Sequence, residues 1–172
     1  MQRVPVRYGL SLFLVVVAFL FMGGCGVIRI HIRHFPRATS EFRTHPIGVR
    51  AFNSSERTLS DAWWEFIFDD IDRAERRFRS CVPSETAELR TIRLAIPIVI
   101  LPAGSVELDD TVVYGITTLD AIFLPSNHVS EQNLVHEWVH VYLYYSGKRY
   151  SGDYFHRNEL FGKCSVSYYS SF

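Results

Sequence analysis

Apolar residues recur at helical spacing in one part of the chain and form short continuous runs in other parts. In the part with helical spacing, the steps are of three and four residues, at Trp64, Ile67, Phe68, Ile71, Ala74 and Phe78. This spacing predicts a helix of about 20 residues with one apolar face. Thr58 and Asp61 have the spacing of a capping box at its start, and Pro83 ends it. The charged run DDIDRAERRFR predicts the solvated side of this helix.

Short apolar runs bounded by turn residues predict strands. The run at 47–55 predicts one strand and the run at 92–101 predicts another, which is bounded by Pro102 and Gly104. Pro97 inside the second run favours an edge position or a bulge, because proline cannot donate to a sheet ladder. The segments TVVYGITTL and DAIFLPS predict one or two further strands.

A second helix is predicted for the segment SNHVSEQNLVHEWVHVYLYYSG. Ser126 or Ser130 can cap its start, and Gly147 can end it. The remainder, 148–172, is expected to be mostly loop with one helical turn around 158–161. A long helix, several short strands and a second helix together predict one α+β domain with a small twisted sheet and a loop-rich C-terminal tail.

The N-terminus has the pattern of a targeting segment. Arg3 and Arg7 precede an uncharged apolar run of about 15 residues, which ends at small residues. This pattern predicts a secretory signal peptide at residues 1–24. The alternative is a single retained membrane span, although the run is shorter than the roughly 20 residues that a spanning helix needs.

Gly23, Gly24 and Cys25 resemble the lipobox of bacterial lipoproteins, in which a lipid is attached to the cysteine. Met22 stands where that motif usually has leucine. The resemblance implies an exported protein of the bacterial cell envelope, held to a membrane by a lipid on Cys25. An ordinary signal peptide that happens to end near a cysteine is the alternative.

Composition and charge fit a small folded domain behind this segment. Residues 25–46 are interpreted as a tether with a basic face, a strand over their alternating first part being the alternative, and 47–172 as the domain. Lys plus Arg and Asp plus Glu number 18 each, so no net charge favours a nucleic-acid partner. We expect a monomer.

The cysteine count predicts one disulfide. The chain has three cysteines, and lipidation of Cys25 would leave Cys81 and Cys164 as an even pair. In an exported and oxidising compartment such a pair is expected to form a disulfide. Two separate buried thiols are the alternative.

The motif HEWVH is the strongest chemical signal in the sequence. On a helix, His136 and His140 lie four residues apart on one face and can offer two ring nitrogens to one zinc ion. Glu137, rotated by about 100° from His136, can reach beside the ion and take a proton from water. Chance produces such a pentapeptide in about two sequences of this kind per hundred, so the charge-poor helical context matters.

The segment LVHEWVHVY resembles the active-site helix of the zincin metallopeptidases. The preceding order of a long helix and then strands resembles the minimal zincin core, over roughly 58–161. The resemblance implies that His136 and His140 bind zinc and that Glu137 is the general base. It also implies a third protein ligand downstream.

The third ligand has several candidates in the segment GDYFHRNELFGKC. A resemblance to the tail of small lipoprotein zincins implies His156, whereas the gluzincin pattern implies Glu159. Asp153, or no third ligand, is the remaining possibility. The other histidines are expected to be solvated, surface or capping residues: His31, His34, His45 and His128. Four tyrosines could stabilise an oxyanion, and none is assigned that role: Tyr150, Tyr154, Tyr168 and Tyr169.

The sequence therefore predicts a membrane-anchored zinc metallopeptidase that acts on a peptide or protein substrate. The alternative is a non-catalytic envelope lipoprotein whose metal site is structural, or whose HExxH pattern is fortuitous.

Overall fold

The structure is a computed structural model of the whole chain. It describes residues 41–55, 57–104, 106–108, 111–118, 120–147 and 156–164. The chain divides into two units, Met1–Pro36 and Arg37–Phe172, and every described residue belongs to the second. The expected signal peptide, Cys25 and most of the expected tether therefore lie outside the described residues.

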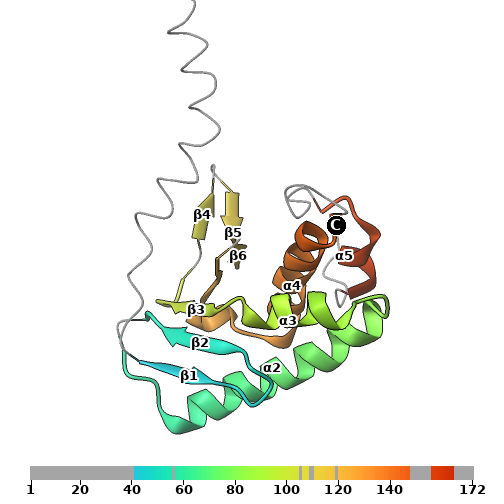
Figure 1. The fold of residues 1–172 in the computed structure, drawn as a ribbon. Coiled ribbons are helices and arrows are strands. Elements are labelled where there is room, and N and C mark those ends of the chain that lie inside the picture. The colour runs from blue at the N-terminus through green and yellow to red at the C-terminus, as the bar shows by residue number, and fades with distance from the viewer. Residues whose placement is uncertain are drawn as a thin grey trace, which may run out of the picture. The chain divides into compact units, whose positions relative to one another are not determined.

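A mixed five-stranded sheet forms one part of the second unit (Figure 1). Its strands are, in spatial order, β1 (Phe42–Thr44), β2 (Arg50–Asn53), β3 (Ile98–Leu101), β7 (Ile122–Pro125) and β6 (Ile116–Thr117). The three central strands are parallel to one another, and the edge strands β1 and β6 are antiparallel to their neighbours. A separate two-stranded hairpin consists of β4 (Val106–Leu108) and β5 (Thr111–Val113).

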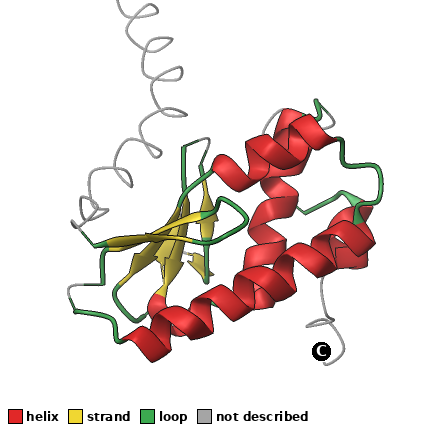
Figure 2. Ribbon diagram, turned by 60° about the horizontal axis from the view of Figure 1, so that its bottom comes forward, coloured by secondary structure: helices red, strands yellow, loops and turns green. Residues whose placement is uncertain are grey.

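Four α-helices pack beside the sheet (Figure 2). They are α2 (Asp61–Cys81), α3 (Ala87–Ala95), α4 (Glu131–Tyr145) and α5 (Glu159–Cys164), and a 3₁₀ helix, η1 (Ser126–His128), precedes α4. The predicted α+β class is thus confirmed. Within the described residues, no helix has both the length and the apolar character needed to cross a membrane.

The long helix α2 forms where its apolar spacing predicts it. Its start differs from the prediction in one detail, because Ser60 rather than Thr58 caps it: the Ser60 side chain accepts a hydrogen bond from the Trp63 amide. Val82 follows the last turn, directly before Pro83. The apolar face is fully buried at Ile67, Ile71 and Phe78, so α2 supplies much of the wall against which α4 packs.

The prediction of one strand over 92–101 is wrong in its first half. The helix α3 covers the chain as far as Ala95, and the Thr86 side chain caps it by accepting a hydrogen bond from the Leu89 amide. Pro97 disfavours helical geometry at the residue before it, so the helix ends there. Because Pro97 precedes β3, the strand keeps all its donors and takes a central position rather than an edge.

The charged side of α2 is also not simply solvated. Asp70 and Glu75 are almost fully buried. The Oδ1 atom of Asp70 accepts hydrogen bonds from the Glu131 amide at 3.0 Å and from the Arg73 guanidinium at 2.7 Å. Since the Glu131 amide belongs to the first turn of α4, Asp70 fixes the start of the helix that carries HEWVH.

The N-terminal edge of the sheet begins earlier than the expected domain boundary at residue 47. The strand β1 pairs with β2 and lies within the stretch 25–46. The prediction of a surface or capping role for His45 is wrong, because its side chain is only 4% exposed and its ring packs edge-on against Phe68. Burial lowers the pKa of His45, and the nearby Asp72 carboxylate opposes this shift.

The helix α4 lies among the other helices and one edge of the sheet. It contacts α2, α3, α5 and β6 (Figure 1). Ser130 caps its start, as one of the two predicted alternatives, and Gly147 follows its end with a φ of 67°. Leu134, Trp138 and Val139 are fully buried. The motif therefore lies on a helix whose orientation is fixed from several sides.

Candidate metal centre

Three histidine side chains come together at the surface of α4. His136 and His140 project from the same face of this helix, and His156 lies just before α5. The Nε2 atom of His156 is 3.1 Å from the Nε2 atoms of both His136 and His140. The three ligand atoms all lie within 4.8 Å of one another, so these residues could hold one metal ion.

The spacing of these nitrogens is close to that of a tetrahedral zinc site. Two nitrogens bound to zinc at the usual bond length lie about 3.3 Å apart, close to the observed 3.1 Å. Burial, together with the nearby His140 and His156, lowers the pKa of His136 to about 3. The His136 imidazole is therefore uncharged at neutral pH, which is the form that coordinates a metal. The donor set fits a metal ion.

The backbone at His156 has an unusual conformation. Its φ is 53°, in the left-handed region that residues other than glycine seldom adopt. Such a conformation costs about 1–3 kcal/mol and persists only where the surrounding structure imposes it. Two residues later, the Asn158 side chain accepts a hydrogen bond from the Leu160 amide at the start of α5. The position of His156 thus depends on how α5 is held.

Phe161 forms an apolar support for all three imidazoles. Its ring centroid lies 5.1 Å from that of His136, 4.7 Å from that of His140 and 4.6 Å from that of His156. The side chain is buried, and it projects from α5. Contacts of this kind orient ligands and limit water access to a metal. The sequence gives no sign of this role, because no spacing distinguishes Phe161 from the other aromatic residues of the C-terminal tail.

Glu137 points away from solvent toward the sheet. Its side chain is 4% exposed, and Oε2 accepts a hydrogen bond of 2.6 Å from the Thr117 hydroxyl on β6. Burial raises the pKa of Glu137 to about 7, and the hydrogen bond from Thr117 opposes this shift. The carboxyl group therefore changes its protonation near neutral pH, the range suited to a group that both takes and returns a proton.

Gly115 lies so close to Glu137 that a side chain has no room there. A Cβ atom at this position would lie 2.6 Å from Oε1 of Glu137 and 2.8 Å from Cδ2 of Leu124. Gly115 and Thr117 therefore hold the carboxylate from two sides. Sequence reasoning missed both residues, since nothing in TVVYGITTL links this segment to a glutamate twenty positions later.

We expect Gly115→Ala to destabilise the protein by about 1–3 kcal/mol, because the added methyl group must displace Glu137 or Leu124. Chemical denaturation of the variant and the wild type measures the difference. Gly162→Ala is the matched control, since a Cβ atom at Gly162 would meet nothing within 4 Å. Equal stability of the Gly115→Ala variant and the wild type would contradict this packing.

The other predicted site residues have different surroundings. Glu159 is outside the group of three histidines, and its carboxylate pairs with Lys163 at 2.8 Å on the exposed side of α5. The ring of His128 lies against that of Tyr114, with centroids 4.3 Å apart. Asp153 and the four C-terminal tyrosines considered above lie outside the described residues.

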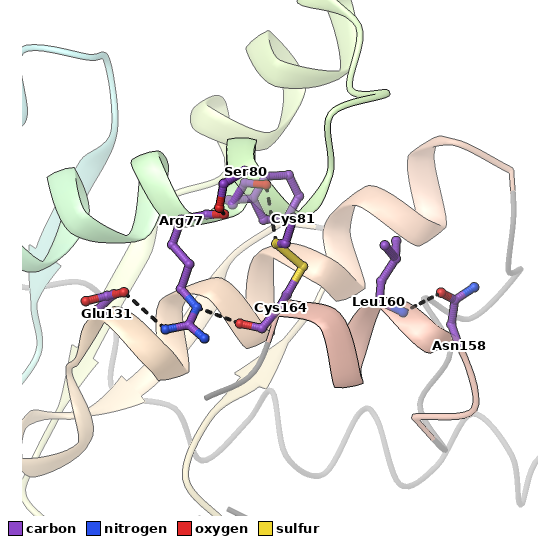
Figure 3. Close-up of a disulfide and its surroundings, with 8 residues drawn as sticks. Arg77, Ser80, Cys81, Glu131, Asn158, Leu160 and Cys164 are labelled. Atoms are coloured by element: carbon purple, nitrogen blue, oxygen red, sulfur yellow. Dashed lines mark hydrogen bonds and ion pairs between the residues drawn. A yellow bond between two sulfur atoms is a disulfide. The ribbon is translucent and has the colours of Figure 1, made fainter. Parts of the chain in front are cut away.

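The predicted disulfide is present between Cys81, at the end of α2, and Cys164, at the end of α5 (Figure 3). The two Cα atoms are 5.3 Å apart. The Arg77 Nε atom donates a hydrogen bond of 2.7 Å to the Cys164 carbonyl. The bond thus ties the segment that carries His156 and Phe161 to the longest helix.

Comparison with known proteins gives no relative. No family model, curated protein or solved structure matches the chain.

Proposed function

We propose that this chain is a zinc-dependent metallopeptidase. The observation that carries the proposal is the convergence of one ring nitrogen each from His136, His140 and His156, together with a buried glutamate on the helix that carries the first two. His136, His140 and His156 would hold the metal, and three protein ligands leave a position for water or substrate, as in catalytic zinc sites. Zinc bound there would polarise a peptide carbonyl and lower the pKa of water.

Glu137 supplies the acid–base chemistry in this proposal. Its carboxylate takes a proton from the attacking water and delivers it to the leaving amine. The close approach of Gly115 and the hydrogen bond from Thr117 limit the rotation of the Glu137 carboxylate, so its orientation is set before substrate binds. The resemblance of LVHEWVHVY to the zincin active-site helix supports the same assignment.

The proposed setting is the bacterial cell envelope. The signal-peptide pattern at 1–24 and the lipobox-like Cys25 support export and attachment to a membrane through a lipid. A disulfide within the folded unit fits an oxidising compartment. The substrate would be a peptide or protein reached from the membrane surface, and the enzyme would act as a monomer.

One observation favours a second candidate function, a non-catalytic protein with a structural metal site. The Glu137 carboxylate is buried and accepts a hydrogen bond from Thr117. This arrangement also suits a residue that only stabilises the packing of α4 against β6. This candidate shares the metal site with the first and differs in the role of Glu137.

We expect purified protein to hold about one zinc ion per chain, and removal of zinc by a chelator to abolish peptide hydrolysis. His156→Ala should lower the affinity for zinc by about 10- to 100-fold or more, because it removes a ligand. Elemental analysis measures the zinc content, and competition with a metal-sensitive dye measures the zinc affinity. Glu159→Ala is the matched control, since this residue is outside the histidine group and should leave zinc affinity unchanged.

Full zinc affinity in His156→Ala together with a loss in Glu159→Ala would reverse the assignment of the third ligand. Protein that binds no zinc with all three histidines intact would overturn the metal site itself. Zinc binding without hydrolysis of any peptide in a mixed library would favour the second candidate.

A further inference from the structure

The short helix α5 connects the disulfide to the metal site. It has six residues, too few for a helix that is stable on its own in water. Cys164 is its last residue. Phe161 lies one turn earlier and packs on the three imidazoles. His156 precedes the first residue of the helix by three positions. Whatever holds α5 in place therefore also holds the third ligand.

Besides the packing of Phe161 on the imidazoles, α5 is attached at its cysteine end. The disulfide joins Cys164 to α2, and the carbonyl of the same residue accepts the hydrogen bond from Arg77 (Figure 3). Arg77 also reaches Glu131 at the first turn of α4, with 3.4 Å between Nη1 and Oε1. Thus α2, α4 and α5 are joined around one covalent bond.

The opposite end of this segment carries the strained residue. The left-handed backbone of His156 persists only while the surrounding structure imposes it, and α5 is the described structure that follows on its C-terminal side. Without its covalent attachment, α5 would be held by noncovalent packing alone, and the strain at His156 would favour withdrawal of this ligand. Metal binding would then fall largely to His136 and His140.

We propose that the Cys81–Cys164 disulfide is a redox latch on the metal site, so that the protein binds its metal tightly when oxidised and weakly when reduced. This inference rests on the proposed function, because it concerns the regulation of the same site. If the chain is exported, the latch would delay tight metal binding until the protein has left a reducing compartment.

The chemical step is a two-electron reduction by a thiol or phosphine reductant. With a dithiol, the Sγ–Sγ bond breaks, each cysteine gains one hydrogen, and the dithiol is oxidised to its own disulfide. With a phosphine and water, the same two thiols form, and the phosphine becomes its oxide. Cys81 is partly exposed and lines a cavity of about 390 Å³ together with Pro83, Ser84 and Leu160, which gives a reductant a way in.

The test uses metal-free full-length protein in oxidised form and after reduction by a phosphine that is then removed. Cobalt(II) is the probe, because its visible absorption reports tetrahedral coordination as well as affinity. We expect reduction to weaken cobalt binding by about 10- to 100-fold and to lower the tetrahedral absorption bands. Far-ultraviolet circular dichroism checks that the reduced protein stays folded.

Measuring the effect of reduction in His156→Ala as well as in the wild type completes a thermodynamic cycle. The cycle separates an effect of the disulfide on His156 from a general stabilisation of the fold. If the disulfide acts through His156, reduction should change cobalt affinity in this variant by no more than about twofold. An equal loss on reduction in the variant and the wild type would show that the disulfide acts through the whole fold, and would overturn the latch. The Cys81→Ser/Cys164→Ser double variant should behave as reduced wild type, and if it fails to fold, the reduced wild type carries the test alone.

The outcomes also separate the latch from the proposed metal site. Oxidised and reduced protein with the same cobalt affinity would overturn the latch and leave the metal site standing. Oxidised protein that binds neither cobalt nor zinc would overturn both.

Discussion

Replacing Glu137 by glutamine is expected to lower peptide hydrolysis by about 10²- to 10⁴-fold, the usual contribution of a general base. The amide has the size of the carboxylate, and its carbonyl oxygen can still accept the hydrogen bond from Thr117. It cannot take a proton from water. Zinc content should remain that of the wild type, because Glu137 is outside the group of potential ligands. Steady-state rates on a mixed peptide library and elemental analysis measure the two effects.

The control for Glu137→Gln is the same substitution at Glu131. Both glutamates lie on α4, but the Glu131 carboxylate lies at the start of the helix and pairs with Arg77. Glu131→Gln should retain full hydrolysis. Loss of zinc in Glu137→Gln would make Glu137 a ligand, and hydrolysis at the wild-type rate would assign the base to another group. Either result contradicts the mechanism proposed for this site.

The sequence predicted the elements whose pattern is local and repeated. The helix α2 was predicted from its apolar spacing and the following proline, although Ser60 rather than Thr58 caps it, and α4 was predicted with a serine cap and a following glycine. The helix α3 has only nine residues, and its helical signal is short beside the continuous apolar run of β3. Local periodicity could not separate the two, because the boundary depends on Pro97 and on the central place of β3 in the sheet.

The residues of the candidate site likewise divide into those that local sequence pattern predicts and those that only tertiary contacts bring together. His136 and His140 lie four residues apart, so helical geometry alone places their side chains together, and it directs Glu137 about 100° to one side of His136. The assignment of His156 came from a resemblance, and the structure brings its ring to the other two. Thr117 and Phe161 reach the site through strand pairing and the docking of α5. Neither contact leaves a trace in the spacing of residues along the chain.

The burial of charged residues on α2 could not be predicted from the sequence pattern. A charged run on a helix is usually solvated, and Asp69 and Arg76 in this run are exposed as expected. Glu75 is buried because its partners Arg90 and Arg93 lie on α3, nine and twelve residues past the end of α2. Whether a charge is buried with partners is decided by tertiary contacts, which a single sequence does not display.

Arg93→Ala is expected to destabilise the protein by about 3–5 kcal/mol, the usual cost of breaking a buried ion pair from one side. The Arg93 side chain is 1% exposed, and it donates to the carboxylates of Glu75 and Glu85 at 2.7–2.8 Å. Its guanidinium carbon lies 4.1 Å from the ring centroid of Phe78 and 4.5 Å from that of Trp138. Removal leaves two buried carboxylates with fewer partners and a gap beside α4. Urea denaturation of oxidised protein measures the change in the free energy of unfolding.

Arg90→Ala is the matched control, since Arg90 pairs with the same Glu75 at 2.7 Å but its side chain is 40% exposed. Solvent screens that pair, so the expected cost is below about 1 kcal/mol. A cost for Arg90→Ala equal to that for Arg93→Ala would mean that burial does not set the strength of these pairs.

The pH dependence of Arg93→Ala tests whether orphaned charge is the cause of its instability. Burial alone would raise the pKa of Glu75, but Arg93 and Arg90 outweigh it and hold this pKa below the ordinary value. A depressed carboxyl pKa contributes stability above the unfolded pKa, and this contribution is lost as the pH falls through the folded pKa. In the variant the pKa of Glu75 rises, so protonation relieves the buried charge at a higher pH. The difference in unfolding free energy between wild type and Arg93→Ala should therefore become smaller as the pH falls from about 7 to about 4. A difference that stays constant over this range would assign the cost to lost packing against Phe78 and Trp138 instead.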